Sequence, residues 1–173
     1  YKRLYAENSE RFSKAFDDVG KRGAFIMQSD LQQFEDHLAD YLGCKYVVGV
    51  ADGTAALVFA LKAAGITQDD EVIVSSHTFV ATAAAVKHVG GTPVICDCLE
   101  DSTMCPESAK IMITTKTKAI MPTQLNGRTA DMEKICKLAD EFKLEVVEDS
   151  CQALGAKYQG INAGLFGTVG SYS

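Results

Sequence analysis

The chain has 173 residues, of which 47% are hydrophobic and 23% charged, so it provides a sizeable core and fits one domain by size. The net charge is −6, and lysine and arginine are scattered along the sequence, which disfavours nucleic acid as the main ligand. The longest apolar run, residues 79–86, is far shorter than the roughly 20 residues of a membrane span, so no membrane association is expected.

Six cysteines show neither the spacing of a secreted disulfide framework nor that of a zinc knuckle, since a single residue separates Cys96 from Cys98. The three histidines are too far apart in sequence to suggest a metal pair, so no metal is expected. Residues 1–10 are polar and charged, unlike a signal peptide. These features favour reduced thiols and a cytoplasmic protein.

The first part of the chain is predicted to be helical. Apolar residues recur at helical spacing over residues 12–19, and Gly20 is expected to end this helix. After a loop at residues 23–26, the Ser-Asp pair at 29–30 offers N-cap chemistry for a second helix that ends at Gly43. Both apolar stripes are interpreted as packing faces.

From residue 45 onward, strand-like and helix-like segments alternate. Strands are expected at residues 46–50, 71–75, 92–96, 119–122 and 144–147. Helices are expected at residues 57–64 and 78–88, after Pro106, and from Asp131 onward. Alternating β and α units predict an α/β fold with three layers, in which a mostly parallel sheet carries helices on both faces.

Two acids stand where the last of these strands should end. Side chains alternate across a strand, so Glu148 and Asp149 cannot face the same way, and only one of them can line a ligand site. The carboxyl ends of parallel strands border the ligand crevice of such sheets. A lone carboxylate there suits a cationic partner, either a metal or a protonated ring nitrogen. The alternative is a loop acid that caps the following turn.

A second candidate feature is the turn at residues 52–55, between a strand and a helix start. Unpaired amide hydrogens at a helix N-terminus bind anions, Gly53 permits close approach of the backbone, and the Thr54 hydroxyl adds a donor. Neither a GxGxxG pattern nor a Walker loop occurs, so an ordinary turn capped by Thr54 remains the alternative. Phe79, after the second strand, is a candidate for stacking on a planar ligand or for filling the core.

Five segments in collinear order resemble the DegT/StrS-type family of sugar aminotransferases. They are GVADGTAAL at 49–57, SHTFVAT at 76–82, LNGRTADM at 125–132, VEDSCQALG at 147–155 and GTVGSYS at 167–173. The resemblance implies the large domain of a fold-type I enzyme that uses pyridoxal 5'-phosphate. The implied reaction moves an amino group from an amino acid, commonly glutamate, to a nucleotide-linked keto sugar, in a homodimer with active sites at the subunit interface.

The resemblance also implies roles for individual residues. It assigns Asp149 to the pyridine nitrogen, where a carboxylate favours the protonated ring, Gln152 to the ring hydroxyl, and Phe79 to stacking on the ring. The residues it assigns to the phosphate are Gly53, Thr54, Ala55 and Ser173.

In domain terms, residues 1–173 are expected to be the N-terminal segment and most of the large cofactor-binding domain, without the small C-terminal domain. The family's Schiff-base lysine follows the serine that Ser173 matches by a few residues, so no lysine in this chain, Lys157 included, is assigned to that role. The fragment alone is therefore expected to be inactive.

Two residues depart from the family pattern. Gln124 stands where many members have histidine, and Asp52 stands where serine or asparagine is common, so its carboxylate must turn away from a phosphate, for example to cap the helix. Two other functions remain open: a lysine-free sugar dehydratase of the same family, and a non-catalytic module that binds a sugar nucleotide. A dinucleotide-binding dehydrogenase is disfavoured because its glycine fingerprint is missing.

Overall fold

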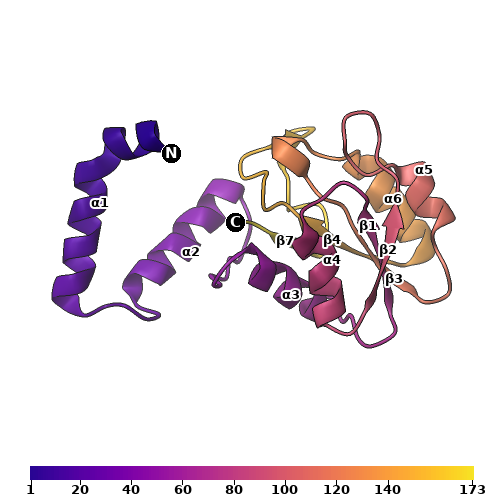
Figure 1. The fold of residues 1–173 in the computed structure, drawn as a ribbon, viewed down its shortest axis with the longest axis horizontal. Helices are drawn as coiled ribbons and strands as arrows, with labels where there is room; N and C mark the ends of the chain where they lie inside the picture. Colours follow the sequence, from indigo (N-terminus) through magenta and orange to yellow (C-terminus); the bar gives the residue numbers. More distant parts are fainter. The chain divides into compact units, whose positions relative to one another are not determined.

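The computed structural model describes residues 1–173, which form two compact units, residues 1–49 and residues 50–173 (Figure 1). The size of the chain suggested one domain, but the first unit is purely helical and contributes no strand to a sheet. No helix here combines the length and apolar character that crossing a bilayer requires.

The first unit contains α1 (Lys2–Arg22) and α2 (Ser29–Leu42). The expected end of the first helix at Gly20 is wrong, because the helix continues to Gly23, which adopts the left-handed conformation at φ 63°. A glycine inside a helix costs only about 1 kcal/mol, whereas a left-handed cap favours glycine strongly. The second helix ends at Gly43, as expected, with φ 77°.

The strand expected at residues 46–50 does not form. These residues have no regular secondary structure, and the side chains of Tyr46 and Val48 are 75% and 77% exposed. The Gly49 amide donates to the Glu35 carboxylate at 2.7 Å instead of to a neighbouring strand. A β-rich sequence makes a strand only where a ladder partner satisfies its backbone.

The second unit is built on a parallel sheet of five strands in the order β2-β1-β3-β4-β7. Its strands are β1 (Glu71–Ser75), β2 (Thr92–Cys96), β3 (Thr117–Met121), β4 (Glu145–Asp149) and β7 (Val169–Ser171). A small antiparallel hairpin pairs β5 (Lys157–Tyr158) with β6 (Ile161–Asn162). The hairpin and β7 were not predicted, because strands of only two or three residues have little periodicity to detect.

Helices cover both faces of the sheet, which confirms the expected three layers (Figure 1). One face packs on α3 (Gly53–Ala63) and α4 (Val80–His88), with Leu57, Leu61 and Val86 in the core. The other face packs on α5 (Pro106–Ile111) and α6 (Met132–Phe142), with Ile135 and Leu138 in the core. A short 3-10 turn, η1 (Leu125–Gly127), follows β3.

Strand alternation sets which side chains reach which face near the site. In β4, Val147 belongs to the core under α3 and α4, while Val146 belongs to the core under α5 and α6. The same alternation sends Asp149 to the α3–α4 side and Glu148 to the α5–α6 side. All five strands run parallel, so their carboxyl ends lie along one edge of the sheet.

Candidate functional site

Asp149 is the last residue of β4, and both its backbone amide and its backbone carbonyl are hydrogen-bonded. Its amide donates to the Pro122 carbonyl at 3.0 Å, and its carbonyl accepts from the Gln124 amide at 2.9 Å. Its side chain is only 4% exposed, and the carboxylate accepts from the Thr82 hydroxyl at 2.6 Å and from the Cys151 amide at 3.3 Å. The carboxylate is therefore fixed in a largely dry place with acceptor capacity to spare.

Three threonines that the sequence did not single out stand in line with this carboxylate. Thr82, in α4, contacts Asp149 directly, and its hydroxyl lies 2.6 Å from that of Thr78. The Thr123 hydroxyl, just after β3, donates to Thr78 at 2.9 Å. Thr82 is part of the resembling segment at 76–82, but no local pattern indicates which distant residue its hydroxyl meets.

Glu148 lies on the opposite face and has a different set of partners. It is fully buried, and its carboxylate accepts from the amides of Gly164, Phe166 and Gly167 at 2.8, 2.6 and 2.9 Å. It also accepts from the Gln124 side chain at 2.9 Å. Four donors satisfy this carboxylate, so Glu148 organises the loop before β7 rather than a ligand site.

Gln124, which replaces the histidine of many family members, is also buried within this second network. Its amide nitrogen donates to Glu148 and its oxygen accepts from the Ala130 amide at 2.7 Å. The side chain therefore joins β4 to the loop that precedes α6. This amide is a structural bridge on the face away from Asp149.

The predicted phosphate turn lies at the start of α3. The Asp52 carboxylate accepts from the Ala55 amide at 2.8 Å, so it caps the helix as expected and already uses one of the predicted phosphate donors. A Cβ on Gly53 would lie 2.9 Å from the Cβ of Ser173 and 2.9 Å from the Cys151 sulfur. Only glycine permits this approach, and the approach brings the start of α3 against Ser173 and the end of β4.

The remaining predicted ligands lie near the same edge of the sheet. Phe79 precedes the first residue of α4, and its ring is 64% exposed, so it does not fill the core. Gln152 is exposed, and its side-chain oxygen accepts from the Asn126 amide at 3.0 Å. Thr54 is half-buried within the first turn of α3.

Cys151 adjoins both Asp149 and Gly53 but is not a nucleophile. Burial raises the pKa of its thiol to about 12, and the neighbouring carboxylate of Asp149 acts in the same direction. The thiol therefore remains protonated at neutral pH, and its sulfur serves as a small packing group.

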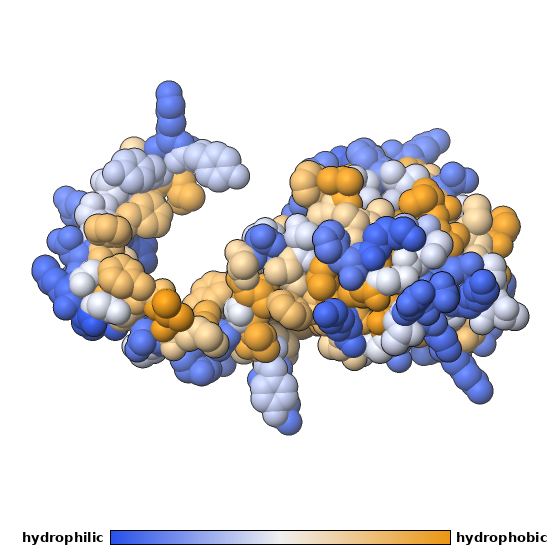
Figure 2. All heavy atoms as spheres, turned by 60° about the horizontal axis from the view of Figure 1, so that its bottom comes forward, coloured by the Kyte–Doolittle hydropathy of each residue, from blue (hydrophilic) through white to orange (hydrophobic).

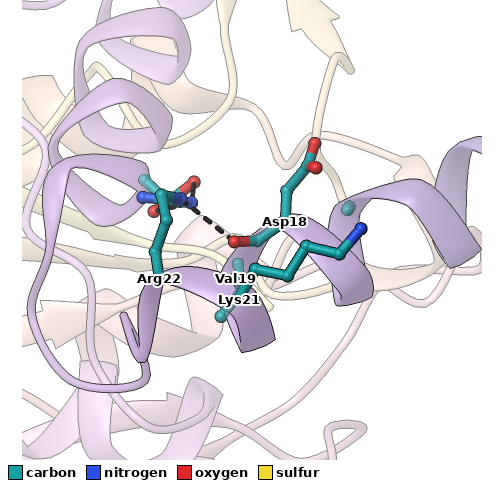
Figure 3. A pocket seen from close by; sticks show the side chains of 6 residues that line it. Asp18, Val19, Lys21 and Arg22 are labelled. Atoms are coloured by element: carbon teal, nitrogen blue, oxygen red, sulfur yellow. Dashed lines mark hydrogen bonds and ion pairs between the residues drawn. The ribbon is translucent and has the colours of Figure 1, made fainter.

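A hollow lies in the first unit (Figure 3). It is lined by residues of α1 and by Asp30 of α2, and its charged groups are already paired. Arg22 binds the Asp30 carboxylate at 2.9 and 3.0 Å and the Asp18 carbonyl at 3.1 Å. This pocket contains none of the predicted site residues, and its Arg22 guanidinium is already occupied by bonds within the chain.

Comparison with known proteins identifies the family. The model of the DegT/DnrJ/EryC1/StrS aminotransferase family matches residues 6–173. The chain belongs to this family.

Relatives from this family are similar to the chain in sequence and in fold. A dTDP-3-amino-3,4,6-trideoxy-alpha-D-glucose transaminase of Streptomyces venezuelae is 38% identical over 174 residues, covering 100% of this chain and 45% of the relative. The X-ray structure of S. venezuelae DesV superposes with a TM-score of 0.92 and 39% identity, covering 94% of this chain and 44% of that one. The expected fold, the large domain of these pyridoxal-phosphate enzymes, is thereby confirmed.

A third relative was solved with its cofactor. NtdA of Bacillus subtilis, with bound cofactor PMP, has a TM-score of 0.87 and 34% identity, covering 91% of this chain and 37% of that one. The chain thus spans less than half the length of the relatives it matches.

The donor set of this family member fits a phosphorylated pyridine cofactor. The fixed carboxylate of Asp149 suits a protonated ring nitrogen. Gly53 approaches Ser173 so closely that a Cβ at Gly53 would fill the space between them, and this narrow place at the start of α3 suits a phosphate. The Asp52 carboxylate is the one group of unfavourable sign, and its bond to Ala55 reduces the number of free amides.

Proposed function

We propose that the protein carrying this chain is a pyridoxal-phosphate-dependent aminotransferase that moves an amino group from an amino acid, glutamate by preference, to a nucleotide-linked keto sugar. Family membership supports the reaction class, and the named activity of the S. venezuelae transaminase supports a nucleotide-linked sugar. The observation that carries the proposal for this chain is the buried, hydrogen-bonded carboxylate of Asp149 at the carboxyl edge of the sheet.

In this proposal Asp149 holds the positive charge of the ring nitrogen. When bound, pyridoxal phosphate supplies an electron sink that is deepest with its ring nitrogen protonated. The Thr82 and Cys151 donors fix the carboxylate so that a remaining lone pair is free to accept the N–H of the ring. Phe79 stacks on the ring and shields it from water, and Gln152 donates to the ring hydroxyl.

The phosphate binds at the start of α3. Amides of the first turn, including that of Gly53, point outward along the helix axis, and the helix dipole favours an anion there. The hydroxyls of Thr54 and Ser173 complete the donor set. The Ala55 amide joins it only if the Asp52 carboxylate is displaced from its 2.8 Å bond.

We also propose that residues 1–173 are the N-terminal segment and most of the large cofactor-binding domain, and that the chain alone binds the cofactor without turnover. No lysine of this chain occupies the place of the Schiff-base lysine in the family pattern. The residues assigned to the ring and the phosphate can hold the cofactor, whereas proton transfer needs a positioned amine.

We propose further that the chain associates with a second copy through α1. No residue of this 21-residue helix is buried, and its exposed apolar side chains include Tyr5, Phe12 and Phe16. Figure 2 shows orange, apolar atoms open to solvent along the N-terminal helices. A helix with an uncovered apolar stripe is stabilised when that stripe meets another surface.

The test is amino transfer by the intact protein, measured with glutamate and keto-sugar nucleotides in the presence of pyridoxal phosphate. We expect activity that depends on the cofactor and falls at least about 100-fold in Asp149→Ala, since the ring charge loses its partner. The matched control is Asp101→Ala, which removes a carboxylate bound by Thr103 in a different loop. Absence of cofactor-dependent transfer with every such nucleotide, or full activity in Asp149→Ala, would contradict the proposal.

A further inference from the structure

Thr82, Thr78 and Thr123 form a row of hydroxyls that ends on the Asp149 carboxylate. The successive oxygen–oxygen distances are 2.6 Å from Asp149 to Thr82, 2.6 Å from Thr82 to Thr78, and 2.9 Å from Thr78 to Thr123. Thr82 is fully buried and Thr123 is 3% exposed, so water does not compete strongly for these bonds. We call these three residues the threonine relay.

The direction of every hydrogen bond in the relay follows from proton counting. A hydroxyl has one proton to donate, and an ionised carboxylate only accepts. Thr82 donates its proton to Asp149, so in the bond between Thr82 and Thr78 the donor must be Thr78. Thr123 in turn donates to Thr78. All three O–H groups therefore point along the row toward Asp149.

Because all three hydroxyls donate in the same direction, they strengthen the hydrogen bond that Thr82 donates to the Asp149 carboxylate. Each hydroxyl that accepts a bond becomes a better donor, so the three dipoles reinforce one another in a low-dielectric site. The row also joins three parts of the edge to the last residue of β4. These parts are the segment after β3, the loop after β1, and α4. The relay therefore fixes both the orientation and the charge of one carboxylate.

We propose that the threonine relay positions Asp149 for a cationic ring nitrogen, with Thr82 as the direct contact and Thr78 and Thr123 acting through it. This assignment rests on the proposed function, since the ring nitrogen belongs to pyridoxal phosphate. The three threonines are positioning residues, because only Asp149 touches the cofactor.

The test compares two ligands by calorimetric titration of the chain. One is pyridoxal phosphate, and the other is its analogue in which the ring nitrogen is replaced by C–H. Thr82→Val is expected to weaken binding of pyridoxal phosphate about five- to tenfold, because a hydrogen bond to a charged group is lost, and to leave the analogue unchanged. Thr82→Ser restores the hydroxyl and is expected to bind like the parent chain.

The matched control is Thr103→Val, which removes an equally buried hydroxyl that donates to Asp101 at 2.8 Å. It should change binding of neither ligand. Equal weakening of both ligands by Thr82→Val would overturn the proposal, because the threonine would then only support the fold. Unchanged binding of pyridoxal phosphate would overturn it as well.

A second measurement separates failure of the relay from failure of the proposed function. In the chain without ligand, the hydroxyl proton of Thr82 is expected to exchange slowly and to give a resolved nuclear magnetic resonance signal. Thr123→Val, two hydroxyls away, should move that signal upfield, because the reinforcement along the row is lost. If the parent chain binds neither ligand, the proposed function fails, and this signal decides the relay. An unmoved signal overturns the relay in either case.

Discussion

The carboxylates of Glu148 and Asp149 are adjacent in sequence but serve opposite faces of the sheet. Glu148 accepts from three loop amides and from Gln124, whereas Asp149 accepts from Thr82 of α4. Glu148 therefore holds the loop before β7 in place, whereas the Asp149 carboxylate, with two donors, retains capacity to accept a further hydrogen bond. The difference between them leads to separate expectations for stability and for binding.

Glu148→Ala is expected to destabilise the chain by about 3 kcal/mol or more, because several buried donors lose their acceptor at once. Urea unfolding measures the free energy. The matched control is Glu141→Ala, whose carboxylate is exposed and paired with Lys110, and it should change the free energy by less than about 0.5 kcal/mol. Equal free energies for both variants would show that the Glu148 network does not hold the fold.

Asp52→Asn is expected to tighten binding of pyridoxal phosphate about two- to fivefold, since it removes a negative charge beside the phosphate and keeps a side chain able to cap α3. Calorimetry with pyridoxal, which lacks the phosphate, is the control and should show no change. Asp52→Ala removes the cap as well and should lower the stability by about 1 kcal/mol. Weaker phosphate binding in Asp52→Asn would show that the carboxylate helps to build the cradle.

Two thiols, one buried and one partly buried, are expected to make the free energy of unfolding fall at alkaline pH. Burial raises the pKa of Cys96 and of Cys151 from 9.0 to about 12. The unfolded chain releases these protons near pH 9 while the folded chain retains them, so the stabilisation is complete below pH 9 and is lost as the pH rises toward 12. Urea unfolding between these limits should show a decline that is smaller in Cys96→Ala and in Cys151→Ala. An identical slope in all three proteins would contradict the assignment.

Association through α1 predicts that Phe16→Ser, at a side chain that is 75% exposed, weakens self-association without destabilising the fold. Sedimentation equilibrium should give a dimer for the parent chain and a larger monomer fraction for the variant. Lys14→Ala, on the same helix, is the control, since it removes only an exposed ion pair with Asp18. A parent chain that remains monomeric at high concentration would contradict this interface.

Sequence alone predicted the parallel sheet, the helices on both faces and the acid at the end of β4, because these depend on local periodicity and on strand alternation. It also predicted that Glu148 and Asp149 diverge. It did not predict which of the two carboxylates would accept hydrogen bonds from the loop before β7. That choice depends on the backbone amides of Gly164 and Gly167, which lie later in the chain. The strand expected at 46–50 failed for the related reason that pairing depends on a partner elsewhere.

The family resemblance named the residues of the candidate site, but the contacts that support them were not predicted. The cap by Asp52 follows from local spacing. The bond of Thr82 to Asp149 joins residues that are 67 positions apart, and the contact between Gly53 and Ser173 spans a still longer separation. The roles of Gln152, Phe79 and Ser173 toward the cofactor remain predictions.

The most direct measurement is the nitrogen-15 resonance of ring-labelled pyridoxal phosphate bound to the chain at neutral pH. The account predicts the signal of a protonated ring nitrogen in the parent chain and of an unprotonated one in Asp149→Asn. An unprotonated ring in the parent chain, or the same signal in both proteins, would contradict the claim that Asp149 holds the ring charge.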